Sequence, residues 1–251
     1  MHNPSIHLSN YEFTGERIVP GKVDFELLEE HISRYRFALD YSIGAKALDA
    51  ACGTGYGCFI LSSVAEKVIG IDISKDAIEF ARNNFQTANS EFLTGDANSI
   101  PFGDNSFNLV TAFEIFEHVM NPSMLISELW RVTANDGYII ISTPNAQVLK
   151  SSKANPFHVR EYKFEEFSEI IQKSIKGRIV FLGQRRCSRR KPLQKYYLLL
   201  KRKLRIGPIL KKHDFEISSN AELLTMKTSS EFSEIGVASS EFFIALIKKV
   251  V

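Results

Sequence analysis

A glycine-containing turn between an apolar run and a helical pattern constrains the fold of this chain most. Residues 47–51 are apolar except for Asp49, and Gly53 and Gly55 follow at once. Glycine adopts backbone dihedrals closed to other residues and lets a ligand approach bare amides. A second apolar run ends on Asp72, about 20 residues after the turn, where an acidic side chain can bind both hydroxyls of a ribose. The sequence therefore predicts a strand–turn–helix–strand unit that binds a nucleoside.

The spacing of the glycines narrows the class of nucleoside. A dinucleotide-binding turn follows the pattern G-x-G-x-x-G, whose third glycine lets the helix pack closely on the strand. Cys58 stands where that third glycine belongs, so the dinucleotide pattern fails and an NAD oxidoreductase is not supported. Asp49, before the turn, would repel a pyrophosphate but suits a cationic ligand with an amino group and a sulfonium.

Alternating strands and helices predict the fold class. The predicted strands are 46–51, 68–73, 91–94, 107–113, 138–142, 177–182 and 241–249, and the predicted helices are 25–41, 56–65, 75–85, 122–132 and 163–174. This alternation is typical of a doubly wound, mostly parallel α/β sheet, whose ligands bind beyond the carboxyl ends of the strands. Asp49, Asp72, Asp96 and Glu114 all fall at or near such ends, which predicts one ligand cleft at that edge.

These motifs resemble the class I S-adenosylmethionine (SAM)-dependent methyltransferases. The resemblance rests on residues 49–57 and on the acid that ends the next strand. It implies SAM as the cofactor and a seven-stranded, Rossmann-like methyltransferase fold with the last strand antiparallel. We expect an N-terminal cap and helix over 1–45, a SAM-binding core over 46–184, a basic insertion over 185–240 and the last strand of the core within 241–251.

The resemblance also implies roles for individual residues. The glycine turn would contact the methionine part and the ribose, Asp72 the ribose hydroxyls, and Asp96 the adenine amino group. The segment 12–17 resembles the start of methyltransferases whose N-terminus folds over the cofactor. The cofactor-binding residues predicted in this way are Asp49, Gly53, Thr54, Gly55, Asp72, Ile73, Asp96, Ala97, Glu114, Arg17 and Tyr35, with Arg34 as a further candidate.

A second motif concerns the acceptor of the methyl group. Glu114, Glu117 and His118 are spaced so that one helical turn would bring them together, and His158 could complete a set of four ligands. The pattern resembles Mg²⁺-dependent O-methyltransferases that act on small-RNA ends and on ubiquinone precursors, and a mixed nitrogen–oxygen site would also take Mn²⁺. The alternative is catalysis without metal, in which His158 or His118 is a general base and Glu114 contacts cofactor and acceptor.

Charge is distributed unevenly along the chain. Fifteen of the 31 Lys and Arg residues lie between Ile170 and His213, a stretch without Asp or Glu, so the remainder carries 16 basic and 29 acidic residues. Leucines and tyrosines among the cations of 185–212 suit an interfacial segment on an anionic membrane surface, although a solvated insertion is an equally simple reading. The three cysteines form no metal or disulfide pattern and the N-terminus lacks signal-peptide order. We therefore expect a cytoplasmic protein, with peripheral contact at the inner face of the membrane.

The identity of the acceptor depends on weaker patterns. The segments 12–21, 155–162 and 183–185 resemble methyltransferases associated with surface-glycan and glycolipid biosynthesis. The leading hypothesis is O-methylation of a sugar hydroxyl in a glycan, a glycolipid or a nucleotide-sugar precursor. The alternatives are O- or C-methylation of a quinone-type or other small aromatic acceptor, and a non-catalytic SAM-binding partner subunit. Nucleic acid is the least favoured acceptor.

Overall fold

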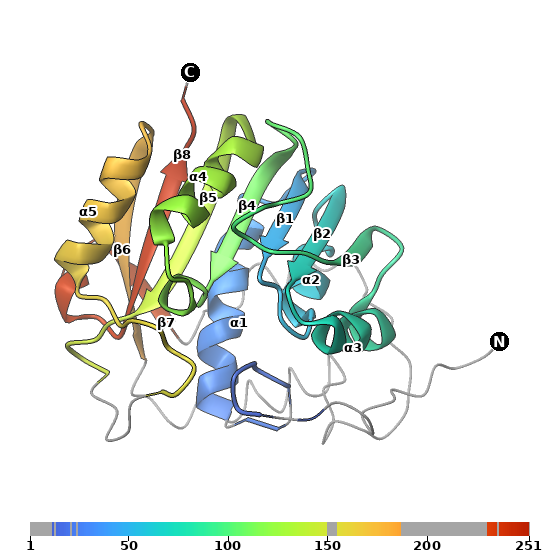
Figure 1. The fold of residues 1–251 in the computed structure, drawn as a ribbon, viewed down its shortest axis with the longest axis horizontal. Helices are drawn as coiled ribbons and strands as arrows, with labels where there is room; N and C mark the ends of the chain where they lie inside the picture. The colour runs from blue at the N-terminus through green and yellow to red at the C-terminus, as the bar shows by residue number, and fades with distance from the viewer. Residues whose placement is uncertain are drawn as a thin grey trace.

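The computed structural model describes residues 12, 14–20, 22–23, 25–149, 155–186, 230–234 and 236–250. The strands are β1 Lys46–Ala50, β2 Lys67–Asp72, β3 Ser90–Thr94, β4 Phe107–Phe113, β5 Thr133–Pro144, β6 Arg178–Arg186, β7 Ser230–Ser233 and β8 Phe242–Lys248. The helices are α1 Phe25–Leu39, α2 Tyr56–Leu61, α3 Lys75–Phe85, α4 Pro122–Val132 and α5 Phe164–Ser174, with 3-10 turns η1 Phe116–His118 and η2 Val237–Ser239. Figure 1 shows them around one central sheet.

The sheet has the strand order β3-β2-β1-β4-β5-β8-β6-β7 (Figure 1). Strands β1 to β5 pair in parallel, whereas β8 runs antiparallel to both β5 and β6. The predicted doubly wound, mostly parallel sheet with an antiparallel last strand is therefore confirmed, and all seven predicted strands are present in it. The order reverses direction between β1 and β4, and such a switch point leaves a crevice at the carboxyl ends of the strands.

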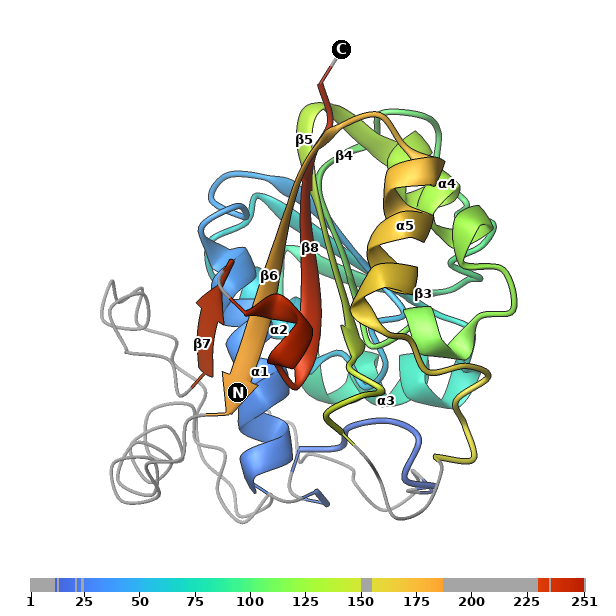
Figure 2. The ribbon, with the colours of Figure 1, turned by 90° about the vertical axis from the view of Figure 1, so that its left-hand side faces the viewer.

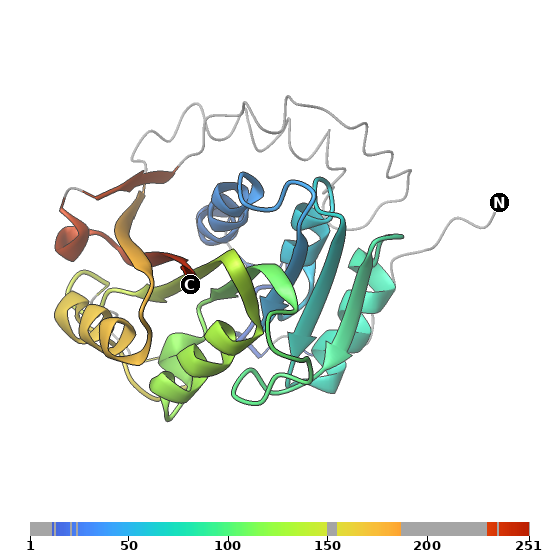
Figure 3. The same cartoon turned by 90° about the horizontal axis from the view of Figure 1, so that it is seen from above.

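Helices cover both faces of the sheet. Figure 2 shows α1 on one side of the strands and α4 and α5 on the other, and the view from above in Figure 3 shows the same division. Apolar side chains of α1, α2 and α3 form one buried cluster with the sheet, and those of α4 and α5 form the second. Because both faces are covered, β1, β4 and β5 can carry nearly continuous apolar runs instead of alternating ones.

The main departures from the predicted elements lie near the C-terminal edge of the sheet. Strand β6 extends to Arg186, and β7, which was not predicted, adds an eighth strand by pairing antiparallel with β6. Residues 185–186 and 230–233 of the predicted insertion 185–240 therefore belong to the sheet. The membrane contact predicted for 185–212 falls on residues that, apart from 185 and 186, lie outside the described ones, and it stays a prediction. Across the described part of the chain, no helix combines the length and apolarity needed to cross a bilayer.

Side-chain caps fix the residues at which α3 and α4 begin. They thereby also fix where the loops before these two helices end. The hydroxyl of Ser74 accepts a hydrogen bond from the Ala77 amide at 3.2 Å, as the predicted cap of α3 requires. The Asn121 side chain accepts from the Met124 amide at 3.2 Å, and Pro122 opens α4. Each cap satisfies an amide that the first helical turn leaves without an intrahelical partner.

The centre of β2 leaves no room for a side chain at Gly70. A Cβ atom there would lie 2.7 Å from Cys58 Sγ and from Phe92 Cδ1. Because overpacking of a dense core costs about 1–3 kcal/mol, we expect Gly70→Ala to lower the free energy of unfolding by that amount. The matched control is Gly103→Ala, whose Cβ would meet its nearest neighbour, Ser106 Oγ, at 3.8 Å. Urea unfolding measures both variants, and equal midpoints would contradict this packing.

Candidate active site

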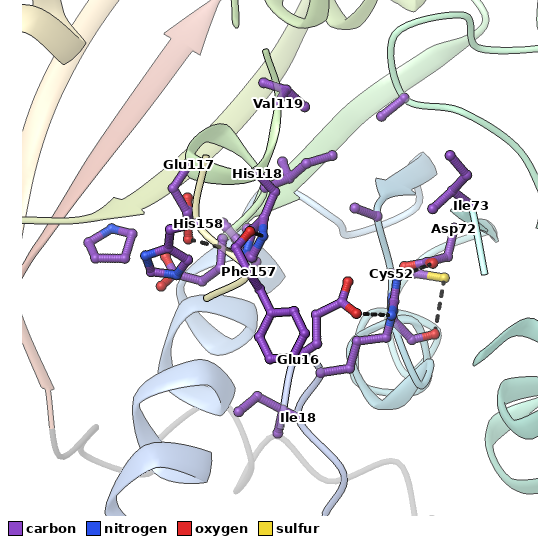
Figure 4. Close-up of a pocket in the computed structure, with 18 of the residues that line it drawn as sticks. Glu16, Ile18, Cys52, Asp72, Ile73, Glu117, His118, Val119, Phe157 and His158 are labelled. Carbon is purple, nitrogen blue, oxygen red and sulfur yellow. Dashed lines mark hydrogen bonds and ion pairs between the residues drawn. The ribbon is translucent and has the colours of Figure 1, made fainter. Parts of the chain in front are cut away.

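A cavity of about 1010 Å³ opens at the carboxyl edge of the sheet, beside the switch point between β1 and β4 (Figure 4). Its volume lies at the upper end of the range for ligand sites, which is about 300–1,000 Å³. Residues that follow β1, β2, β3, β4 and β5 all contribute to its wall. The predicted site residues that line it are Arg17, Tyr35, Gly53, Thr54, Asp72, Ile73, Asp96, Ala97, Glu114, Glu117, His118 and His158.

The turn after β1 depends on left-handed backbone conformations. Ala51, Gly53 and Gly55 have φ angles of 60°, 54° and 88°. At Gly55 a Cβ would also lie 2.5 Å from the Cβ of Ala81 in α3, so close packing of the helices requires glycine there. Gly55 therefore shapes the turn, while Gly53 and Thr54 form the cavity wall.

Asp72 ties this turn to the end of β2. Its Oδ2 accepts from the Gly53 amide at 3.0 Å and its Oδ1 from the Ser74 amide at 2.9 Å. Arg17 Nη2 lies 3.2 Å from Oδ1 and also belongs to the cavity wall. The N-terminal segment thus reaches the predicted ribose-binding carboxylate, and the hydroxyl of Thr54 fixes this segment by donating to the Ile18 carbonyl at 2.7 Å.

Asp49 occupies a different place from the one its motif suggests. Among the predicted cofactor residues, all of which the structure describes, Asp49, Gly55 and the further candidate Arg34 do not line the cavity. Asp49 is completely buried, and its carboxylate accepts from Tyr35 at 3.0 Å, from Thr111 at 2.7 Å and from Cys58 at 3.5 Å. Burial raises the pKa of Asp49 to about 6, although these donors oppose the shift. Its hydrogen-bond partner Tyr35 does line the cavity. Asp49 can therefore act on a ligand by orienting Tyr35.

The predicted adenine end of the cavity lies after β2 and β3. Ile73 is 69% exposed at the mouth, although large apolar side chains are usually covered. Asp96 Oδ1 accepts from the amide and the side chain of Asn98, at 2.8 and 3.0 Å. These bonds hold the turn that brings Ala97 into the cavity wall.

Glu114 follows β4 with a strained backbone, at a φ of 53°. A non-glycine residue in this region costs free energy, and such strain concentrates at functional sites. The Glu114 carboxylate accepts from the Ser142 hydroxyl at 2.7 Å and lies 3.6 Å from Arg34 Nη1. Arg34 is fully buried, with its Nε bonded to Gln184 at 2.7 Å and its guanidinium 4.1 Å from the centre of the Phe242 ring.

The predicted group of four metal ligands is brought together in part. Ligand atoms of Glu117, His118 and His158 lie within 4.8 Å of one another, and Figure 4 shows them at one end of the cavity, across from Asp72. Among the described residues, Glu114 is outside this group, because the residues after β4 form a short 3-10 turn in place of the α-helical turn that we expected. The Glu117 carboxylate is 1% exposed and accepts from Thr143 at 2.9 Å, and burial and the nearby Glu114 raise its pKa.

The two histidines differ in which of their ring nitrogens are hydrogen-bonded. His118 Nδ1 lies 2.9 Å from the Phe157 carbonyl, which can only accept, so Nδ1 carries the proton and Nε2 keeps a lone pair. Burial lowers the pKa of His118, which keeps the ring neutral. In His158, by contrast, Nε2 lies 2.9 Å from Asn155 Nδ2 and Nδ1 lies 3.2 Å from Glu161 Oε1. Of the two rings, that of His118 thus keeps one nitrogen without a hydrogen bond among the described residues, Nε2, which lies 4.0 Å from Glu117 Oε1.

The wall of the cavity is acidic. Among the described residues that line it, six carry carboxyl groups and Arg17 is the single Arg or Lys. The six are Glu16, Asp72, Asp96, Glu114, Glu117 and Glu161. This set suits a ligand with positive charge and opposes a ligand with phosphate groups.

Several residues of the wall were missed by sequence reasoning. Phe242 comes from β8, and Phe157 and Asn155 come from the segment before α5. That segment is held in place because the Glu117 carbonyl accepts from the amides of Val159 and Arg160. The pattern of 155–162 assigns no role to Asn155 or Phe157, and no local pattern marks Phe242, since their places depend on chain segments that meet only in the folded sheet.

The chain matches the model of a protein family described as the methyltransferase domain, over residues 42–201. The chain belongs to this family. It is 29% identical over 163 residues to a protein from Mycolicibacterium smegmatis named a probable S-adenosylmethionine-dependent methyltransferase, and the match covers 63% of each chain. The chain therefore spans less than two thirds of the length of that relative.

Two further proteins are similar, one over a shorter stretch of sequence and one in its fold. A demethylmenaquinone methyltransferase from Paenarthrobacter aurescens is 30% identical over 105 residues, which are 42% of this chain and 41% of that protein. The crystal structure of a SAM-dependent methyltransferase from Thermotoga maritima, described as a possible histamine N-methyltransferase, superposes with a TM-score of 0.59 at 17% identity. That superposition covers 89% of this chain and 92% of the other, and at this identity it establishes the shared fold.

The buried carboxyl of Asp49 makes stability depend on pH. Its pKa of about 6 exceeds the value near 4 of an unfolded chain, so the folded state retains a proton that the unfolded state releases. As pH rises from 4 to 6.5, this preference is lost, and we expect the free energy of unfolding to fall by roughly 2–3 kcal/mol relative to Asp49→Asn. Urea unfolding of both proteins across this range measures the difference. Parallel pH curves for the two proteins would refute the assignment.

Proposed function

We propose that this chain is a SAM-dependent methyltransferase that methylates a hydroxyl oxygen. The observation that carries the proposal is the joint placement of Gly53, Asp72 and His118 on the wall of one cavity. The first two suit a nucleoside cofactor, and the third suits an acceptor that must lose a proton. Figure 4 shows Asp72 and His118 on opposite sides of the cavity.

The residues present fit SAM in shape and in charge. When bound, SAM supplies a methyl group on a positively charged sulfonium. The acidic wall would balance this charge and that of the amino group. Asp72 would accept from the ribose hydroxyls, the turn at Gly53 would admit the cofactor against its backbone, and Ile73 would cover the adenine. Arg17, which pairs with Asp72, would bind the carboxylate of the methionine part.

His118 would take the proton of the acceptor. A hydroxyl is a poor nucleophile until a base or a metal ion removes its proton. The neutral ring of His118 offers Nε2 for this purpose, and the Phe157 carbonyl fixes its orientation. Methyl transfer is otherwise governed by position, so the remaining task of the chain is to align the acceptor oxygen with the cofactor. Glu114, held by Ser142 and Arg34, would contact both.

A divalent ion offers a second way to remove the proton. Glu117, His118 and His158 would hold it, and the ion would lower the pKa of the acceptor hydroxyl. A set of one carboxylate and two imidazoles suits Mn²⁺ or a similar ion better than Mg²⁺, which prefers oxygen ligands. For this role His158 would have to give up one of its present hydrogen bonds.

A sugar hydroxyl remains the leading acceptor, and a quinone-type phenol is the second candidate. The resemblance of segments 12–21 and 155–162 to glycan-modifying methyltransferases supports the first. The similarity to a demethylmenaquinone methyltransferase supports the second. Assay of labelled methyl transfer to glycolipids and to quinone precursors distinguishes them. Transfer to neither acceptor, with SAM still bound, would favour a non-catalytic SAM-binding subunit.

Cofactor binding tests the role of Asp72. Calorimetry with S-adenosylhomocysteine should show binding that is about ten- to a hundredfold weaker for Asp72→Asn, because a hydrogen bond to a charged group contributes about 1.5–3 kcal/mol. The control is Asp76→Asn, which removes the same charge from an exposed position in the first turn of α3. Equal affinities for the two variants would exclude Asp72 from the site. No heat from the unmodified protein would contradict the proposed function itself.

Turnover tests the proton acceptor. We expect His118→Asn to lower kcat by about 10²–10⁴-fold, the range for loss of a general base, and His158→Asn to lower it by less than tenfold. Both substitutions replace an imidazole by an amide, so they serve as controls for each other. Equal losses would contradict His118 as the sole base. Loss of turnover with a chelator, restored by Mn²⁺, would assign the step to the divalent ion.

A further inference from the structure

Exposed apolar side chains gather around the mouth of the cavity. The described residues include seven large apolar side chains that are exposed: Ile43, Ile73, Met120, Met124, Val148, Val159 and Val250. Ile73, Met120 and Met124 line the cavity. Val148 and Val159 are the neighbours in sequence of the lining residues Leu149 and His158. Met120 is 85% exposed and Met124 is 50% exposed. Apolar side chains concentrated at one edge of a binding cavity indicate a ligand that covers them.

Five lining residues form what we call the acceptor rim: Val119, Met120, Met124, Leu149 and Phe157. The first three follow His118 in the chain: Met120 precedes Asn121, the N-cap of α4, and Met124 lies in the first turn of that helix. Leu149 and Phe157 come from the chain between β5 and α5, on which His158 also lies. The rim is thus continuous with the histidines that face the acceptor, and it is separate in sequence from the turns that face the cofactor.

The chemistry of the rim differs from that of the cavity wall. Methionine is flexible and polarizable, and it adapts to apolar ligands of irregular shape. The wall carries six carboxyl groups against the single cation of Arg17 among the described lining residues. Arg17 already pairs with Glu16 and Asp72, and Arg34 lies beside Glu114. Among the described residues of the wall, a phosphate group close to the reacting hydroxyl would therefore find no unpaired Arg or Lys, whereas an uncharged head needs none.

We propose that the acceptor is an amphiphile, with an uncharged, hydroxyl-bearing head at His118 and an apolar chain over the acceptor rim. This inference rests on the proposed function, and it narrows the substrate to an uncharged lipid-like molecule. Nucleotide sugars and RNA fall outside this class because they place phosphate near the head. Each methylene that the rim buries fully would tighten binding about fourfold, and half-burial would tighten it about twofold.

Alkyl maltosides provide a probe with a sugar head and a chain of adjustable length. We would load the protein with S-adenosylhomocysteine and measure the affinity for maltose, hexyl maltoside and octyl maltoside by calorimetry, below their micelle concentrations. The expected result is an affinity that rises about fourfold between the hexyl and octyl compounds. The double variant Met120→Ser/Met124→Ser should remove most of this rise. Ile43→Ser, which removes a 66% exposed apolar side chain outside the cavity lining, should retain it.

The outcomes separate this inference from the function on which it rests. Affinity that does not change with chain length, while S-adenosylhomocysteine still binds, would overturn the amphiphile and leave the methyltransferase. A rise with chain length that persists in the double variant would overturn the role of the rim. Light scattering is the final check, because a lower mass of the double variant in solution would assign the rim to contact between copies of this chain.

Discussion

The carboxylate of Asp72 holds together the edge of the sheet on which the site is built. It accepts from the Gly53 amide in the turn after β1 and from the Ser74 amide at the start of α3. These bonds join two strand ends that lie side by side in the sheet. The turn can approach this closely because Gly53 and Gly55 adopt left-handed conformations. The cofactor end of the cavity depends on this arrangement, and the pairing of Arg17 with the same carboxylate brings the N-terminal segment into the site.

The opposite end of the cavity depends on buried charge. Arg34 is fully buried, and among the described residues its Nη1 and Nη2 have no hydrogen-bond acceptor; Glu114 lies 3.6 Å from Nη1. A buried cation is costly unless it is compensated, so this pair and the Phe242 ring bind α1, β4 and β8 to one another at the cavity. Glu117 is buried nearby and anchors the segment that carries His158. The acceptor end is thus built from four separate parts of the chain.

Local sequence patterns predicted one end of the cavity wall better than the other. The turn after β1, the acid at the end of β2 and the turn after β3 are local patterns, and each takes the predicted position in the wall. The group Glu114, Glu117, His118 and His158 depends on how a short turn is wound, and the 3-10 turn η1 leaves Glu114 outside. Asp49 is a second example. Its motif predicts contact with the ligand, but the side chain is completely buried, accepts hydrogen bonds from three side chains and does not line the cavity.

The sequence by itself determined the alternation of strands and helices and the residues of the glycine turn. These properties follow from apolar periodicity, from backbone freedom and from spacing along the chain, all of which are local. The tertiary structure alone decided the tautomer of His118, the pairing of Arg34 with Glu114, the extra strand β7 and the apolar rim beside the histidines. Each of these depends on segments far apart in sequence, and only packing of the sheet against its helices brings them into contact.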